Sequence, residues 1–165
     1  MKAIEADARR HAWCRSQALW TFGMTTRGFL EDARGARQAG QGALLRFAAR
    51  MIGETCAVAL NIALNRERPL PGPAMRASWA LERLQGHELR QPCWELIRGI
   101  DAPAEDVLER CEALVAESAA LIGEMPNPLT PQGHIPAIAL ARDWIKLMDL
   151  LGEESLVPAG WTLRG

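Results

Sequence analysis

The feature that most constrains the fold is a long segment, residues 42–65 (GALLRFAARMIGETCAVALNIALN), which is apolar almost all the way round a helix. Such a helix has to be covered by other elements, because only contact with them removes its side chains from water. The sequence PLPGP at 69–73 ends it, since proline lacks the helical N–H and disfavours the helical region for the residue before it. We therefore expect a buried central helix.

Several other segments have the spacing of amphipathic helices, and none alternates in the manner of a strand. Gly23 and Gly28 are placed to interrupt the chain between the first two of these helices. The prediction is an all-α, up-and-down bundle of four to five helices in one domain spanning 1–165. The additional helices are expected at 3–22, 29–37, 74–85, 90–99, 103–123 and 136–151.

The composition is that of an ordinary globular domain. Hydrophobic residues make up 48% of the 165 residues, charged residues make up 24%, and the formal net charge is -1. This balance gives no basic stripe for tracking phosphates and argues against nucleic-acid binding. The longest strongly apolar run, 56–64, is interrupted by Asn61 and is short for a membrane span, and residues 1–10 lack a signal peptide's apolar region. We expect no membrane association and a cytoplasmic location.

The four cysteines lie in separate apolar segments, without a CxxC pair or a histidine at ligand spacing. This pattern predicts reduced core thiols rather than a disulfide framework or a zinc site. The HExxH, GxGxxG, Walker and GxSxG motifs are also absent, so the sequence supports no metal site, no cofactor, and neither nucleophilic nor metal catalysis. Whether the chain is an enzyme stays open. The cysteines are Cys14, Cys56, Cys93 and Cys111.

A line of polar residues crosses the apolar segment. Arg50, Glu54, Asn61 and Asn65 are spaced at i, i+4, i+11 and i+15, which places all four within about a quarter-turn of one another. In the structural interpretation, Arg50 and Glu54 form an i,i+4 pair at a partly wet edge, and Asn65 caps the helix end. In the functional interpretation, the line faces a groove where Arg50 holds an anion, Glu54 acts as general acid or base, and both asparagines bind substrate.

Other candidate binding residues lie on the first predicted helix and in a proline-rich loop. His11 and Arg15 are one helical turn apart, and Trp20 is two turns from another tryptophan, although such aromatic pairs are more often core than ligand platform. His134 belongs to the loop 125–136, and loop residues over a rigid scaffold often carry function.

The segment 60–84 (LNIALNRERPLPGPAMRASWALERL) resembles the helical C-terminal domain of nucleotidyltransferases that modify aminoglycosides, and hence the wider HEPN-type bundles. In that group a buried helix ends in a Leu-Asn pair, a proline or glycine turn follows, and a basic residue begins the next helix. The similar elements here are Leu64-Asn65, the turn 69–73 and Arg76, while Glu54 is similar to an acidic residue of the same helix.

The resemblance implies a bundle, often dimeric, that binds a substrate or packs against a nucleotidyltransferase domain. Two departures limit what it implies about activity. The catalytic domain, with its GS motif and paired aspartates, is missing. The Arg-x4-His signature of HEPN ribonucleases is missing as well, since only three residues separate Arg83 from His87.

Two functional hypotheses follow. The first is a HEPN-like module that binds a small molecule or a partner enzyme, with a homodimer as its expected assembly. The alternative is a small helical enzyme of secondary metabolism that uses Glu54 as acid or base and Arg50 to hold an anionic substrate. A toxin-like ribonuclease is a weaker third hypothesis, because the near-neutral charge argues against a basic cleft.

Overall fold

The computed structural model describes residues 18–65 and 73–123, and these residues confirm an all-α bundle with no strand among them. The predicted helix 136–151 and most of the predicted helix 3–22 lie outside this part of the chain. The described elements are η1 (Thr21–Thr26), α2 (Arg27–Gln38), α3 (Gly42–Asn65), α4 (Pro73–Arg83), α5 (Arg90–Arg98) and α6 (Ala104–Ile122).

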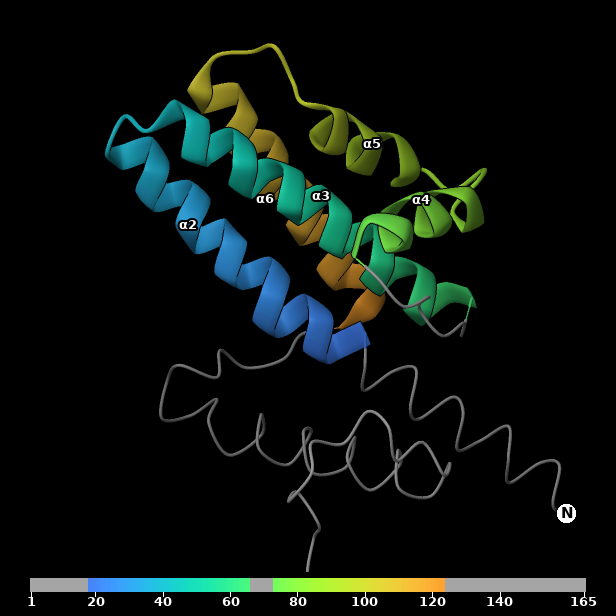
Figure 1. Ribbon diagram of the computed structural model, residues 1–165. Helices are drawn as coiled ribbons and strands as arrows, with labels where there is room; N and C mark the ends of the chain where they lie inside the picture. The colour runs from blue at the N-terminus through green and yellow to red at the C-terminus, as the bar shows by residue number, and fades with distance from the viewer. Residues whose placement is uncertain (1–17, 66–72, 124–165) are drawn as a thin grey trace, which may run out of the picture.

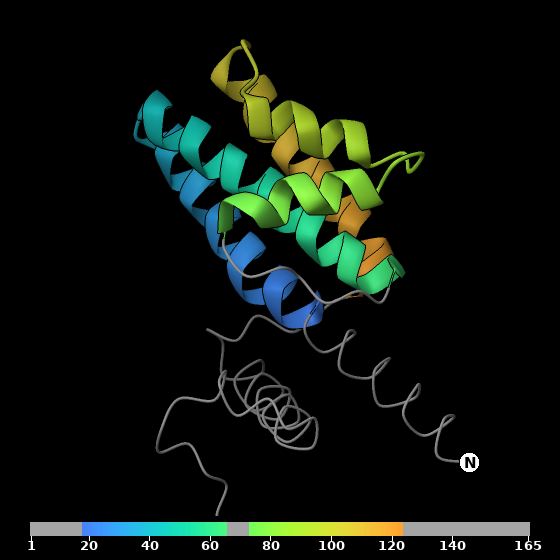
Figure 2. The same ribbon diagram turned by 45° about the vertical axis from the view of Figure 1, so that its right-hand side comes forward.

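Helix α3 runs through the middle of the bundle and contacts every other described element (Figures 1 and 2). Helices α2 and α5 run antiparallel to it, whereas α6 runs parallel to it on the far side in the view of Figure 1. The short α4 lies across its C-terminal half. The predicted arrangement around a central helix is therefore confirmed.

Glycine and proline set the limits of these helices. The turn between α2 and α3 contains Gly40, whose φ of 66° lies in the left-handed region that glycine adopts without strain. Helix α6 begins directly after Pro103 and carries Glu105 and Asp106 in its first turn, where acidic side chains stabilise the helix dipole. It ends at Gly123, which also has a positive φ.

The two glycines near the start of the described chain do not break the helix. Instead, η1 is a six-residue π-helical stretch that continues directly into α2. The wider π turn places Thr26 in the core, where its Oγ1 donates a hydrogen bond of 2.8 Å to Thr55 Oγ1. Thr55 Oγ1 in turn donates to the carbonyl of Met51 at 2.8 Å. The buried hydroxyl of Thr26 thus has a partner.

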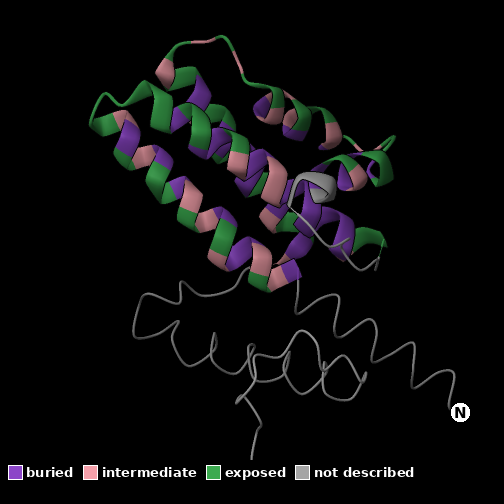
Figure 3. Ribbon diagram, viewed as in Figure 1, coloured by how far each residue is buried: buried purple, intermediate pink, exposed green. Residues whose placement is uncertain are grey.

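The two halves of α3 differ in their burial (Figure 3). Residues 56–62 are buried without interruption, whereas the N-terminal half leaves Leu44 43% and Phe47 54% exposed. Helix α4 lies across only the C-terminal half of α3. The described helices therefore surround the central helix over only part of its length.

Taken as a whole, α3 is long and apolar enough to cross a membrane by length and composition. However, 56% of its most apolar 18-residue window is buried against the rest of the chain, which is the behaviour of a core helix. This burial is compatible with a soluble protein.

Helix α5 approaches α3 closely at Gly53, which is buried. A Cβ atom added at Gly53 would lie 2.8 Å from the carbonyl oxygen of Cys93 and 2.9 Å from Cβ of Leu96. The absence of a side chain at this position is what lets the two backbones come together.

Candidate functional site

The predicted polar line of α3 is divided into two separate pairs. In the first, Arg50 Nε donates to Glu54 Oε1 at 2.9 Å, with the Arg50 side chain 61% exposed and the Glu54 side chain 17% exposed. The interpretation of these residues as an i,i+4 pair at a wet edge is confirmed. Exposed pairs of this type contribute only about 0.3–0.5 kcal/mol to stability.

The second pair consists of Asn61, which is buried, and Asn65, which is exposed beside the end of α4. Asn65 Nδ2 donates to Asn61 Oδ1 at 2.6 Å and to the carbonyl oxygen of Arg83, at the end of α4, at 3.3 Å. Asn65 lies at the end of the helix, as the structural interpretation expected, and both of its described side-chain contacts are donated by Nδ2. The Nδ2 of Asn61 is buried and has no hydrogen-bond partner among the residues that the structure describes. This second pair joins α3 to α4 through the bond from Asn65 to Arg83, and no described hydrogen bond connects it to Arg50 or Glu54.

Among the other candidates, Trp20 is 38% exposed and lies just before η1. His11, Arg15 and His134 lie outside the described residues.

A groove that the sequence did not indicate lies between α5 and α6, with a volume of about 160 Å³. Its floor is apolar and its rim carries Glu95, Arg110 and Glu117. The residues of the floor are Pro92 and Leu96 of α5, Ile100 of the connection after α5, and Ala113 and Leu114 of α6. The floor residues of α5, Pro92 and Leu96, are four residues apart, a spacing visible in the sequence, but the rim charges meet only through the packing of the two helices.

Some of the charged side chains at the rim of this groove already have partners, and one does not. Arg110 Nη1 forms an ion pair with Glu95 Oε2 at 2.9 Å, and Gln91 Nε2 donates to Glu95 Oε1 at 3.1 Å. Glu117, by contrast, is exposed and has no hydrogen bond or ion pair to any residue that the structure describes. The rim therefore holds two carboxylates and one guanidinium, and one of the two carboxylates, Glu117, is available to a ligand.

The described thiols are part of the core. Cys56, Cys93 and Cys111 are free and buried, which confirms the prediction for these three, while Cys14 lies outside the described residues. Burial raises the pKa of Cys93 and of Cys111 to about 12. Burial, and then the nearby Cys93 thiol, raise the pKa of Cys56 well above its ordinary value. Thiols held protonated in this way are poor nucleophiles and poor metal ligands.

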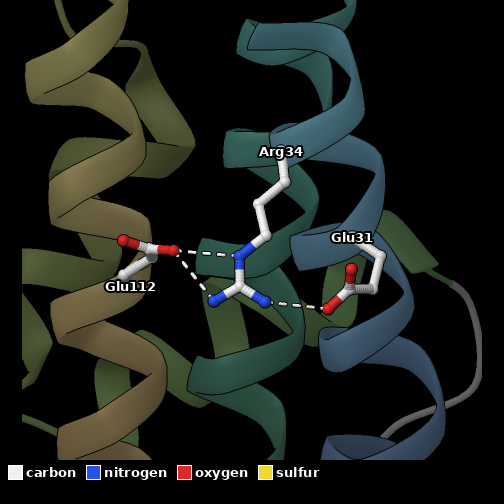
Figure 4. A network of polar contacts seen from close by, with 3 residues as sticks. All are labelled: Glu31, Arg34 and Glu112. Carbon is white, nitrogen blue, oxygen red and sulfur yellow. Dashed lines mark hydrogen bonds and ion pairs between the residues drawn. The ribbon is translucent and has the colours of Figure 1, made fainter. Parts of the chain in front are cut away.

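Ion pairs connect the outer faces of α2 and α6. Arg34 on α2 lies between Glu31 of its own helix and Glu112 of α6, with nitrogen–oxygen distances of 2.8 Å to each (Figure 4). Arg37 pairs with Glu105 in the same way. Both arginines, Arg34 and Arg37, are thus already paired with carboxylates of the described residues.

Neither a metal centre nor a known relative guides the assignment further. In residues 18–65 and 73–123, no group of three or more His, Cys, Asp or Glu side chains is arranged to hold a metal ion. Comparisons with protein-family models, with curated proteins and with solved structures find no match to the chain. The function therefore has to be argued from the geometry of its own residues.

Proposed function

We propose that this chain is a HEPN-like helical module that binds a small, ring-bearing primary amine in the groove between α5 and α6. The observation that carries the proposal is the groove itself, with its apolar floor and the unengaged carboxylate of Glu117. The resemblance of residues 60–84 to HEPN-type bundles supports the same class of function. A cytoplasmic location and an accessory role beside a separately encoded enzyme belong to this proposal.

The size of the groove favours a single ring. Its volume of about 160 Å³ is close to the roughly 150 Å³ of an engineered apolar cavity that holds benzene. Apolar residues from both helices supply the surface on which a ring can lie, and binding pockets generally combine such a lining with few polar groups.

The charges of the rim favour a cation. Arg110 neutralises Glu95, since the two form an ion pair at 2.9 Å, so Glu117 determines the net sign of the rim. An ammonium group can pair with Glu117 without breaking any described contact. A carboxylate or phosphate ligand would instead have to take Arg110 from Glu95.

Benzylamine is a suitable first probe, with benzyl alcohol and benzoate as matched compounds of similar size and different charge. Because the groove is open and the probe is small, we expect a dissociation constant near about 1 mM, which corresponds to about 4 kcal/mol. An NMR titration should shift the amide signals of Ala113 and Ile100. Benzyl alcohol should bind more weakly and benzoate more weakly still.

The substitution Glu117→Gln should weaken benzylamine binding about two- to fivefold, as expected for loss of an exposed ionic contact of about 0.4–1 kcal/mol. Glu109→Gln is the matched control, because Glu109 is exposed on α6 and does not line the groove. Equal binding of the amine and the alcohol would refute the ligand class. No response to any of the three probes would refute the groove as a binding site.

The enzyme hypothesis keeps Glu54 as its acid or base and Arg50 as its anion-holding group. In the structure these two side chains already bind each other, so an anionic substrate at Arg50 would have to compete with Glu54. A substrate screen of the wild type and of Glu54→Gln tests this hypothesis: turnover that disappears in a folded variant would favour it over the binding module.

A further inference from the structure

A second, smaller hollow adjoins the groove between α5 and α6. It has a volume of about 10 Å³ and lies where α3 meets the first turns of α6 and the connection after α5. Leu96 and Ile100 line both the groove and the hollow, so the two share a wall. Leu96 is buried, whereas Ile100 is partly exposed. A ligand in the groove therefore reaches the hollow along Ile100. The hollow is lined by Arg46, Ala49, Leu96, Gly99, Ile100 and Val107.

The hollow and the groove differ in the sign of the charge that each offers to a ligand. Arg46, at the hollow, is exposed and has no hydrogen bond or ion pair to any residue that the structure describes. None of the described residues that line the hollow is acidic. Arg50, one turn further along α3, is already paired with Glu54. The hollow thus presents a guanidinium without a described partner, and the groove beside it presents the carboxylate of Glu117.

We propose that the ligand of the groove is a zwitterion: its ring carries an ammonium group that binds Glu117 and a chain that passes Ile100 and ends in a carboxylate bound by Arg46. This inference rests on the proposed function and narrows the class of its ligand. A hollow of about 10 Å³ holds roughly one water-sized group, so it admits part of a methylene chain but no ring. The carboxylate stays outside it, where the exposed guanidinium can bind both of its oxygens.

The spacing of the two charges sets the length of the ligand. Val107 lines the hollow and Glu117 lines the groove, and these residues of α6 are about 15 Å apart along the helix axis. A carboxylate attached directly to the ring of benzylamine is too close to the amine to span this separation, whereas one on a chain of several methylenes, met by the long side chain of Arg46, can span it. Neither contact disturbs the pair of Arg110 and Glu95.

Three benzylamines with a carboxylate at the para position test the inference by NMR titration of the full chain. The carboxylate is attached directly, through two methylenes or through four, and each acid is compared with its uncharged primary amide of the same length. The longest acid should bind about two- to fivefold more tightly than its amide, as expected for one added exposed ionic contact. The shortest acid should gain nothing over its amide. Arg46→Gln should abolish the gain of the longest acid, and Arg46→Lys should retain part of it.

Arg98→Gln is the matched control, because Arg98 is an exposed arginine beside Gly99 that lines neither the groove nor the hollow. It should leave the difference between acid and amide unchanged. Acids that bind no more tightly than their amides at any length overturn the inference. A gain that survives Arg46→Gln, or that Arg98→Gln removes equally, overturns it as well.

Benzylamine without a carboxylate distinguishes the failure of this inference from the failure of the proposed function. If benzylamine binds and none of the acids gains over its amide, the proposed function stands and the zwitterionic ligand is wrong. If neither benzylamine nor any acid or amide binds, both proposals are wrong. Arg46→Gln should leave the affinity for benzylamine itself unchanged, because the amine binds at Glu117.

Discussion

Because α3 and α5 pack closely at Gly53, a side chain at this position should destabilise the fold. Substitution by alanine would place Cβ 2.8 Å from the backbone oxygen of Cys93, 2.9 Å from Cβ of Leu96 and 3.1 Å from Cγ1 of Ile97. Two of these atoms belong to the backbone or lie next to it, so they cannot move unless α5 shifts. Overpacking of this kind typically costs about 1–3 kcal/mol.

The steric cost is partly offset, because alanine in a helix interior is favoured over glycine by about 0.5–1 kcal/mol. Gly35 provides the control, since it lies within α2 and a Cβ added there meets nothing within 4 Å. Gly35→Ala should raise the free energy of unfolding by about 0.5–1 kcal/mol. Gly53→Ala should lower it by about 1 kcal/mol. The difference between the two variants isolates the steric cost, because both gain the same propensity.

Urea unfolding followed by circular dichroism, at one fixed protein concentration, measures both variants. The expected difference of about 1–3 kcal/mol corresponds to melting temperatures roughly 2–12 °C apart for a chain of this size. If Gly53→Ala stabilised the chain as much as Gly35→Ala does, α5 could not pack on α3 at this point. The placement of the α5–α6 groove would then also be wrong.

Two further predictions concern ionisable groups. Burial raises the pKa of Cys93 and Cys111 to about 12 in the folded chain, so on raising the pH the unfolded chain loses its thiol protons first. The contribution of these two thiols to the free energy of unfolding should therefore be constant below about pH 8.5 and fall between about pH 9 and 12, by up to about 1.4 kcal/mol per pH unit for each thiol. Urea unfolding at pH 8 and pH 10 measures this fall, and an unchanged free energy of unfolding would contradict the prediction. A double-mutant cycle on Arg34→Ala and Glu112→Ala should give a coupling free energy of about 0.2–1 kcal/mol. This coupling should decrease in 1 M NaCl, because both side chains are over 40% exposed and salt screens exposed charges. A coupling unaffected by salt would show that solvent does not screen the pair.

The positions of most described helices could be predicted from the sequence. The central helix has the predicted bounds, and the predicted segments 29–37, 74–85 and 90–99 each end within two residues of a described helix. Periodicity indicates where a helix lies, and glycine or proline indicates where it stops. The π turn at 21–26 was not predicted, since Gly23 and Gly28 have the same sequence signature in a turn and in a widened helix.

The candidate site was less predictable. The Arg50–Glu54 pair follows from i,i+4 spacing within one helix, so the sequence alone indicates it. Arg110 and Glu95 are 15 residues apart in sequence and lie on different helices, so their ion pair exists only because α5 packs on α6. Likewise, the apolar character of α3 predicted burial on all sides, but burial depends on how far the 11-residue α4 reaches.

Glu54 and Glu117 are the two acidic residues considered for a cationic ligand, and they differ in their described contacts. Glu54 is 17% exposed and bound to Arg50, so a ligand there gains an ionic contact only by breaking one. Glu117 has no described partner and stands over an apolar floor, so an ammonium group adds a contact while its ring covers the side chains below. Exposed ion pairs differ little in strength, and the exchange at Glu54 is therefore close to neutral whereas the addition at Glu117 is a net gain. For this reason the groove between α5 and α6, rather than the polar line on α3, is the surface on which a ligand should first be sought.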